Sequence, residues 1–177
     1  MRLSKNCLVI AIFGKSCTGK STVADKLGEF LNAEVRHCGE ILKSRALQLR
    51  KSVSDLSSAD HRLIDSQTRD WASGASVPRV VEGIFLAEVL SGLEGVVFIR
   101  LVCDTEVRER RLRERQGSSS SIQARDKEDD LRRQELYHEQ ISSPLYLDLL
   151  EIDTTKRAPH EVVAEIIAHI SSLGDEH

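Results

Sequence analysis

Residues 7–21 read CLVIAIFGKSCTGKS, and this stretch decides the fold. Cys7 to Phe13 form a continuous apolar run that ends at Gly14, which is typical of a strand buried on both faces of a parallel sheet. From Ser21 to Leu31 the apolar side chains recur at helical spacing. The sequence therefore predicts a buried strand, a glycine-containing loop and a helix, in that order.

The loop, Gly14 to Ser21, matches the pattern GxxxxGK[ST], which is specific for a phosphate-binding loop when it joins a strand to a helix. Its glycines allow the backbone amides to wrap around phosphate oxygens, and the helix adds its positive end. We expect Lys20 to reach the β- and γ-phosphates of ATP, and Ser21 to hold Mg²⁺. The candidate ATP-binding residues of this segment are Gly14, Lys15, Ser16, Cys17, Thr18, Gly19, Lys20, Ser21 and Thr22.

Beyond the loop, strands and helices alternate along the chain. Further strands are predicted at 33–37, 79–82, 96–102 and 149–152, and helices at 40–50, 58–72, 105–115, 122–140 and 161–170. This alternation predicts an α/β fold with a parallel sheet covered on both faces. With the loop it favours the three-layer P-loop NTPase fold, which has a five-stranded parallel sheet of order 2-3-1-4-5 and a helical lid. We expect a single domain over 1–177, with acceptor-binding helices at about 39–74 and the lid at about 105–140.

The predicted lid is rich in arginine. Residues 107–115 read VRERRLRER and residues 125–133 read RDKEDDLRR, on either side of the GSSSS segment at 117–121. Two charged helices joined by a mobile tip can close over a substrate and exclude water. The alternative is a pair of solvent-exposed helices whose Glu–Arg pairs contribute only about 0.2–0.5 kcal/mol each.

Composition limits the classes of protein to consider. The chain has 177 residues, 40% of them hydrophobic and 30% charged, with a net charge of −3, which is typical of a soluble globular domain. The charge gives no support for nucleic-acid binding, and no apolar run approaches the ~20 residues of a membrane span. We expect ATP and a small-molecule acceptor, a nucleotide or nucleoside, as partners of a monomer or homodimer, with no nucleic acid and no membrane.

The four cysteines, Cys7, Cys17, Cys38 and Cys103, form no CxxC pair and lack the spacing of metal ligands. We therefore expect small buried thiols in the reducing cytoplasm. Cys17 is the exception, because it lies inside the phosphate loop, where bound nucleotide would protect it from alkylation.

A phosphate loop alone does not choose between a kinase, a GTPase and a motor ATPase. The sequence has no NKxD segment, which disfavours a GTPase, and no LSGGQ segment, which disfavours a transporter-type ATPase. A small kinase is the class that fits best.

Segments along nearly the whole chain resemble the nucleoside monophosphate kinase group, and cytidylate kinases most of all. Arg125, Asp129 and Arg132 in RDKEDDLR match the RDxxDxxR helix of those enzymes. The segment from Cys38 to Lys43 is similar to their acceptor-binding segment. Short stretches that resemble theirs are VVEG at 80–83, LY at 136–137 and EIDT at 151–154.

The resemblance implies roles for individual residues. Arg125 and Arg132 would clamp the acceptor phosphate and the transferring phosphoryl group, and Asp129 would hold the acceptor sugar or orient an arginine. The residues Arg110, Arg111 and Arg115 would lie in the lid over ATP, with 154–157 near the adenine. The candidate catalytic residues are Lys20, Arg125, Asp129 and Arg132, and the candidate substrate-binding residues are Cys38, Gly39, Lys43, Asp65, Glu82, Gly83, Arg125 and Asp129.

Glu82 is predicted to end the third strand beside the first. A carboxylate there can bind Mg²⁺ through water together with Ser21, or align the acceptor, or simply cap the following turn. Asp65, on the helix predicted at 58–72, could reach the acceptor.

Two positions depart from the cytidylate kinase pattern. Ile84 stands where those enzymes carry an arginine after the glycine, and Lys43 replaces another arginine, so that two phosphate contacts are weakened. Arg36, Arg45 and Arg79 are candidates to compensate. The string VVEGIF also resembles uridine-kinase-like proteins, whose acceptor is a hydroxyl.

Three hypotheses follow from the sequence. The first is transfer of the γ-phosphoryl group of ATP to (d)CMP or a related nucleoside monophosphate. The second is a kinase of a nucleoside or another small-molecule hydroxyl, which needs a nearby carboxylate from Glu82, Asp65 or Asp129. The third is a nucleotide-binding regulatory protein without turnover, which would not need a lid full of arginines.

Overall fold

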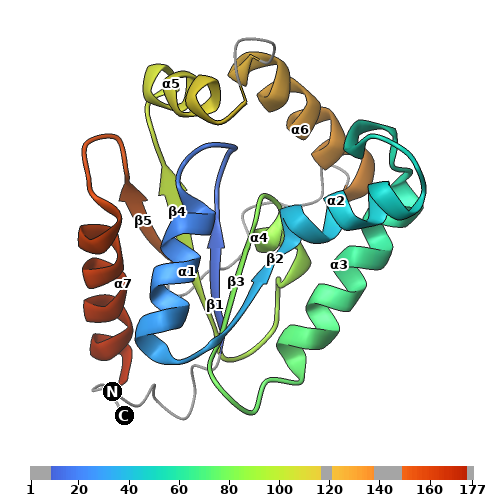
Figure 1. Cartoon of the computed structure of the whole chain (residues 1–177). Coiled ribbons are helices and arrows are strands. Elements are labelled where there is room, and N and C mark those ends of the chain that lie inside the picture. Colours follow the sequence, from blue (N-terminus) through green and yellow to red (C-terminus); the bar gives the residue numbers. More distant parts are fainter. Residues whose placement is uncertain (1–8, 117–120, 138–148, 175–177) are drawn as a thin grey trace.

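The computed structural model describes residues 9–116, 121–137 and 149–174, and its centre is one five-stranded parallel sheet (Figure 1). The strand order is β2-β3-β1-β4-β5, which confirms the predicted order. The strands are β1 (Val9–Phe13), β2 (Glu34–His37), β3 (Arg79–Gly83), β4 (Val96–Val102) and β5 (Leu149–Asp153).

Strand β1 lies in the middle of the sheet, and all five of its residues are buried. Its register pairs Ile12 with Glu82 of β3 and Phe13 with Arg100 of β4. Because the strands are parallel, the loop that leaves β1 emerges beside the carboxyl end of β3. This arrangement brings the phosphate loop next to Glu82, as the sequence predicted.

Helices cover both faces of the sheet and form two separate cores. On one face α1 (Lys20–Leu31) and α7 (Pro159–Gly174) pack against β1, β3, β4 and β5. On the other face α3 (Ser58–Ser73) and α4 (Leu86–Val89) pack against β1, β3 and β4. The alternating side chains of β1 serve the two cores in turn: Ile10 and Ile12 belong to the first, Ala11 to the second.

Three helices gather beyond the carboxyl edge of the sheet (Figure 1). These are α2 (Cys38–Gln48), α5 (Thr105–Gln116) and α6 (Ile122–Tyr137). The predicted lid therefore consists of two helices. Cys7, most of the GSSSS tip (117–120) and the predicted end of the second lid helix (138–140) lie outside the described residues.

Some predicted boundaries were wrong. Helix α2 begins at Cys38, two residues before the predicted start, and it ends at Gln48 because Arg50 adopts a left-handed backbone conformation with φ of 55°. Helix α4 and the single turn at Val53–Asp55 were not predicted, since elements this short show no periodicity. Ser57 caps α3: its side chain accepts from the backbone amide of Asp60, and the Asp60 side chain accepts from the backbone amide of Ser57.

Among the described residues, no helix combines the length and the apolar character needed to cross a membrane.

Candidate active site

Side chains from α5 and from the end of β5 hold the carbonyl oxygens of the phosphate loop. Three hydrogen bonds do this: Arg108 Nε to Ser16 O at 2.8 Å, Arg111 to Cys17 O at 3.3 Å, and Thr154 Oγ1 to Thr18 O at 2.8 Å. Across a trans peptide the C=O and N–H bonds point in opposite directions, so the amides that follow these carbonyls point away from the bound side chains. The loop thereby presents N–H donors in a row, as an anion site requires.

Two glycines and one cysteine give this loop its shape. Gly14 has φ of 142°, and a Cβ at this position would lie 2.2 Å from the carbonyl oxygen of Leu101. Gly19 has φ of 99° and caps α1. Cys17 has φ of 65°, a left-handed conformation that is uncommon outside glycine. The loop therefore stores local backbone strain at the point where an anion would bind.

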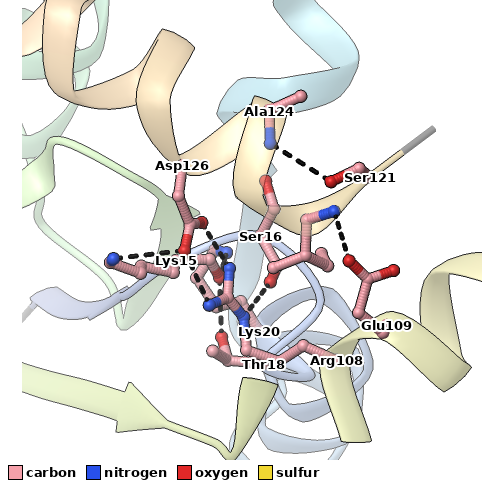
Figure 2. A network of polar contacts seen from close by, with 10 residues as sticks. Lys15, Ser16, Thr18, Lys20, Arg108, Glu109, Ser121, Ala124 and Asp126 are labelled. Carbon is pink, nitrogen blue, oxygen red and sulfur yellow. Dashed lines mark hydrogen bonds and ion pairs between the residues drawn. The ribbon is translucent and has the colours of Figure 1, made fainter. Parts of the chain in front are cut away.

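Lys20 is buried, with an exposed fraction of 8%, at the start of α1. Its Nζ donates to the carbonyl oxygen of Lys15 at 2.9 Å, so the side chain lies across the loop (Figure 2). Burial lowers its pKa, and the nearby carboxylates of Glu82 and Asp129 act in the opposite direction. An anion bound in the loop would stabilise the charged ammonium group further.

Ser21 and Glu82 form the candidate magnesium site. Ser21 Oγ donates to Glu82 Oε1 at 3.2 Å. His37, at the end of β2, lies between two carboxylates: its Nδ1 is 3.2 Å from Glu82 Oε1 and its Nε2 is 3.0 Å from Asp25 Oδ1. Hydroxyl and carboxylate oxygens are ligands that Mg²⁺ prefers, with water and phosphate oxygens completing an octahedron, so this donor set fits the ion.

No group of three or more His, Cys, Asp and Glu side chains in residues 9–116, 121–137 and 149–174 is arranged to hold a metal ion.

One cavity of about 1080 Å³ extends from the phosphate loop to α2, α3 and α6, where the acceptor was predicted to bind; this part is termed the acceptor end. Nearly every residue predicted for the site lines it. At the loop end these are Ser16, Cys17, Thr18, Gly19, Lys20, Ser21, Thr22, Arg111 and Arg115; at the other end they are Cys38, Gly39, Lys43, Asp65, Glu82, Gly83, Arg125, Asp129 and Arg132.

Three predicted residues do not line this cavity. Gly14 packs against Leu101, and the Lys15 side chain extends to Asp126 of α6 at 3.2 Å. Arg110, predicted to lie over ATP, is on the exposed side of α5, because the helical turn directs its neighbour Arg111 inward instead.

The acceptor end has unsatisfied polar atoms. Among the described residues, Asp129 Oδ2 and His61 Nε2 are buried without a hydrogen-bond partner, and both residues line the cavity. Burial raises the pKa of Asp129 to about 6, a change that Lys20 partly opposes. Buried polar atoms in proteins are normally paired, so a ligand with hydrogen-bond donors would satisfy them.

Most other polar groups at the acceptor end are already paired. Asp65 accepts from Tyr137 Oη at 2.6 Å, and burial raises the pKa of this carboxyl. Arg132 donates to the carbonyl oxygens of Ser54 and Leu56, at 3.3 and 3.2 Å. An apolar part of the wall is formed by Leu42, Val53, Ile64, Ile84, Phe85, Leu86 and Val89.

The arginines proposed to compensate for Ile84 lie elsewhere. Arg45 is held by Asp60 at 2.8 Å. Arg36 of β2 and Arg79 of β3 both lie against the ring of Trp71, with their Cζ atoms 5.6 and 4.8 Å from the ring centroid. None of these three arginines lines the cavity, so the structure gives no support for a role of theirs at the acceptor.

Sequence reasoning missed Arg108, Asp126 and His37. Arg108 was one of several arginines in a charged helix, and Asp126, the first aspartate of the RDxxDxxR pattern, was given no role. The sequence held no signal that separates Arg108 and Asp126 from the other charged residues of their helices. Only the structure shows that each lies one helical turn from a fully buried apolar residue, Leu112 or Ile122.

The sequence matches the AAA domain family (AAA_18) over residues 10–134, more than half of the chain. The chain belongs to the AAA domain family. Among curated protein sequences, none matches this AAA domain protein.

Solved structures with the fold of this AAA domain protein include three with bound ligands or named activities. They are a gluconokinase from Sinorhizobium meliloti 1021 (17% identity, TM-score 0.65, covering 99% of this chain and 96% of that chain), a shikimate kinase from Acinetobacter baumannii in complex with shikimate (15%, 0.67, 96% and 96%) and the YorR protein from Bacillus subtilis in complex with phosphorylated GDP (18%, 0.63, 96% and 99%). At these identities the likeness shows a shared P-loop kinase fold.

Proposed function

We propose that this AAA domain protein is an ATP-dependent kinase of a small-molecule acceptor, with residues 1–177 as one kinase domain. The observation that carries the proposal is one continuous cavity with the phosphate loop at one end and Arg125, Asp129 and Arg132 along it. The gluconokinase and the shikimate kinase of the same fold support it, since both are named for small-molecule acceptors.

At the donor end, the loop amides from Ser16 to Thr22 and the ammonium group of Lys20 would bind the phosphates of ATP. Arg111 and Arg115 of α5 would lie over the nucleotide, and 154–157 would pack near the adenine. Ser21 and Glu82 would hold Mg²⁺, which supplies charge neutralisation at the phosphates when bound.

At the acceptor end, we propose a nucleoside monophosphate of the cytidylate type. Arg125 and Arg132 would clamp its phosphate, and the unpaired Oδ2 of Asp129 would accept from a sugar hydroxyl. The remaining contacts would come from Cys38, Gly39, Lys43, Asp65, Glu82 and Gly83.

The reaction would be an in-line displacement. An oxygen of the acceptor phosphate forms a bond to the γ-phosphorus as the bond to the β–γ bridging oxygen breaks, and ADP leaves. A phosphate oxygen is already ionised, so no strong base is needed, and positioning with charge neutralisation by Lys20, Arg125 and Arg132 supplies the catalysis.

A second candidate is a hydroxyl acceptor, and Asp129 is the observation that favours it. A carboxylate with a pKa of about 6 and an unpaired oxygen in the cavity can take the proton of an attacking hydroxyl at neutral pH. Ile84 in place of an arginine also suits an acceptor without phosphate.

The test is ADP release over a panel of nucleosides, nucleoside monophosphates and hydroxylated acids and sugars. Turnover with CMP or dCMP that falls about 100-fold in Arg132→Ala supports the phosphate acceptor. Lys127→Ala, which removes an exposed cation from the same helix, is the matched control.

Turnover only with unphosphorylated acceptors would reject the nucleoside monophosphate and favour the second candidate. Tight ATP binding without turnover on any acceptor would indicate a regulatory nucleotide-binding protein instead.

A further inference from the structure

Helix α6 touches both ends of the cavity. In its first turns Asp126 contacts the loop side, while in its last turns Arg132 donates to the carbonyl oxygen of Leu56 and Tyr137 donates to Asp65. One rigid element therefore connects the donor and acceptor halves. A contact that fixes its first turns also fixes the position of the acceptor residues further along it.

Arg108 makes the contact between α6 and the phosphate loop (Figure 2). Its Nε donates to the carbonyl oxygen of Ser16 at 2.8 Å, while its two terminal nitrogens donate to the two carboxylate oxygens of Asp126 at 3.0 and 2.5 Å. All three guanidinium nitrogens donate, in a planar arrangement that only arginine can offer. Lys15, next to Ser16 in the loop, reaches the same carboxylate at 3.2 Å.

This pair differs from the surface pairs expected for a charged helix. The Arg108 side chain is only 4% exposed and that of Asp126 17%. Arg108 and Lys15 hold the pKa of Asp126 below its usual value against the opposing effect of burial. Removing one partner would leave a buried charge unpaired, so the contact should be maintained rather than fluctuate.

A second bond reinforces the connection between α5 and α6. Glu109, the neighbour of Arg108 on α5, accepts from the backbone amide of Ile122, which opens α6, at 2.9 Å. Two adjacent residues of α5, Arg108 and Glu109, therefore hold the start of α6. The ion pair of Asp126 with Lys15 connects α6 directly to the loop as well.

We propose that Asp126 is a positioning residue: it holds the Arg108 guanidinium against the phosphate loop and ties α6 to bound nucleotide. Occupation of the loop by the β-phosphate would then fix α6 and the acceptor residues that it carries. The effect of Asp126 on catalysis rests on the proposed kinase function. The coupling between the loop and α6 depends only on nucleotide binding.

The experiment measures ADP and AMP binding by titration calorimetry in wild type, Asp126→Asn, Arg108→Lys and the double variant. Each single substitution is expected to weaken ADP binding about tenfold, because a charged hydrogen-bonded pair is broken, and to leave AMP binding unchanged. The double variant should be no weaker than the worse single one, since both substitutions break one interaction.

Asp130→Asn and Arg113→Lys are matched controls, since they make the same changes at exposed positions of α6 and α5. A second measurement follows amide hydrogen exchange: ADP should slow exchange in α6 of wild type and not in Asp126→Asn.

Wild-type ADP affinity in Asp126→Asn would overturn the proposal. So would equal losses of ADP and AMP binding together with a lower melting temperature, which would indicate a merely structural pair. Failure of the kinase assay on every acceptor would reject the proposed function and leave these binding results untouched.

Discussion

In the donor half of the cavity, three successive loop carbonyls accept hydrogen bonds from side chains, and the buried Lys20 has a backbone partner. In the acceptor half, as far as the structure describes the chain, His61 and Asp129 each bury a polar atom without one. The donor half is therefore preorganised for its ligand, whereas the acceptor half still lacks part of its hydrogen bonding. Substitutions should accordingly act differently in the two halves.

The largest expected effect is that of Lys20→Ala in the donor half. Phosphoryl transfer should fall about 100-fold or more, because a preorganised charge at the transferring group is lost. Initial rates of ADP release measure this effect, with Lys26→Ala, an exposed lysine of the same helix, as control. Activity close to that of wild type would show that the loop does not hold the reacting phosphates.

The donor half could be predicted almost completely from the sequence. Its chemistry depends on one contiguous segment of backbone. The positions of two glycines and one lysine in the sequence are enough to predict that segment. Arg108 and Asp126 could not be predicted, because the sequence does not show which of many arginines faces the loop until α5 and α6 are placed over it.

The next effect concerns the border between the halves. Glu82→Gln should raise the Mg²⁺ concentration needed for ADP binding about tenfold, since one carboxylate ligand is lost. His37→Asn should raise the required Mg²⁺ concentration by a smaller factor, because His37 only orients Glu82. Calorimetric titration of ADP at several Mg²⁺ concentrations measures both, with the exposed Glu29→Gln as control. An unchanged requirement in Glu82→Gln would exclude this residue from the metal site.

A smaller effect tests the unsatisfied acceptor half through Asp129. Its carboxyl has a pKa raised from 3.8 to about 6 in the folded protein. The folded state therefore binds more protons than the unfolded state between these values, and stability falls as pH rises through this range. Asp129→Asn should match wild type below pH 4 and be more stable at pH 7 by about 3 kcal/mol.

Urea unfolding at both pH values measures this difference, and Asp70→Asn, at an exposed position of α3, should show none. Equal free energies of unfolding for wild type and Asp129→Asn at pH 7 would contradict the raised pKa of Asp129.

The acceptor half was harder to predict from the sequence for a physical reason. Its wall combines side chains from α2, α3, α4, β3 and α6, and only their packing decides which charges remain available. Arg36, Arg45 and Arg79 were equal candidates in the sequence, and the structure pairs all three outside the cavity.

The smallest effect is expected at Asp60, below the acceptor half. Its hydrogen bonds to Ser57 and Arg45 lower its pKa to about 2. This contribution to stability is present above pH 4 and is lost as pH falls toward 2, because the carboxyl then becomes protonated. Asp60→Asn should lower the melting temperature at pH 7, and the difference from wild type should shrink in acid. A constant difference would contradict the assigned role of the charge.

Trp71 is the single tryptophan of the chain, and it lies on α3 with the guanidinium groups of Arg36 and Arg79 at 5.6 and 4.8 Å from its ring centroid. Those arginines belong to β2 and β3, so the indole ring sits where the acceptor-side helix meets the edge of the sheet. The protein thereby carries its own optical reporter. Tryptophan emission should respond to movements of α3 relative to the sheet when an acceptor binds, without any added label.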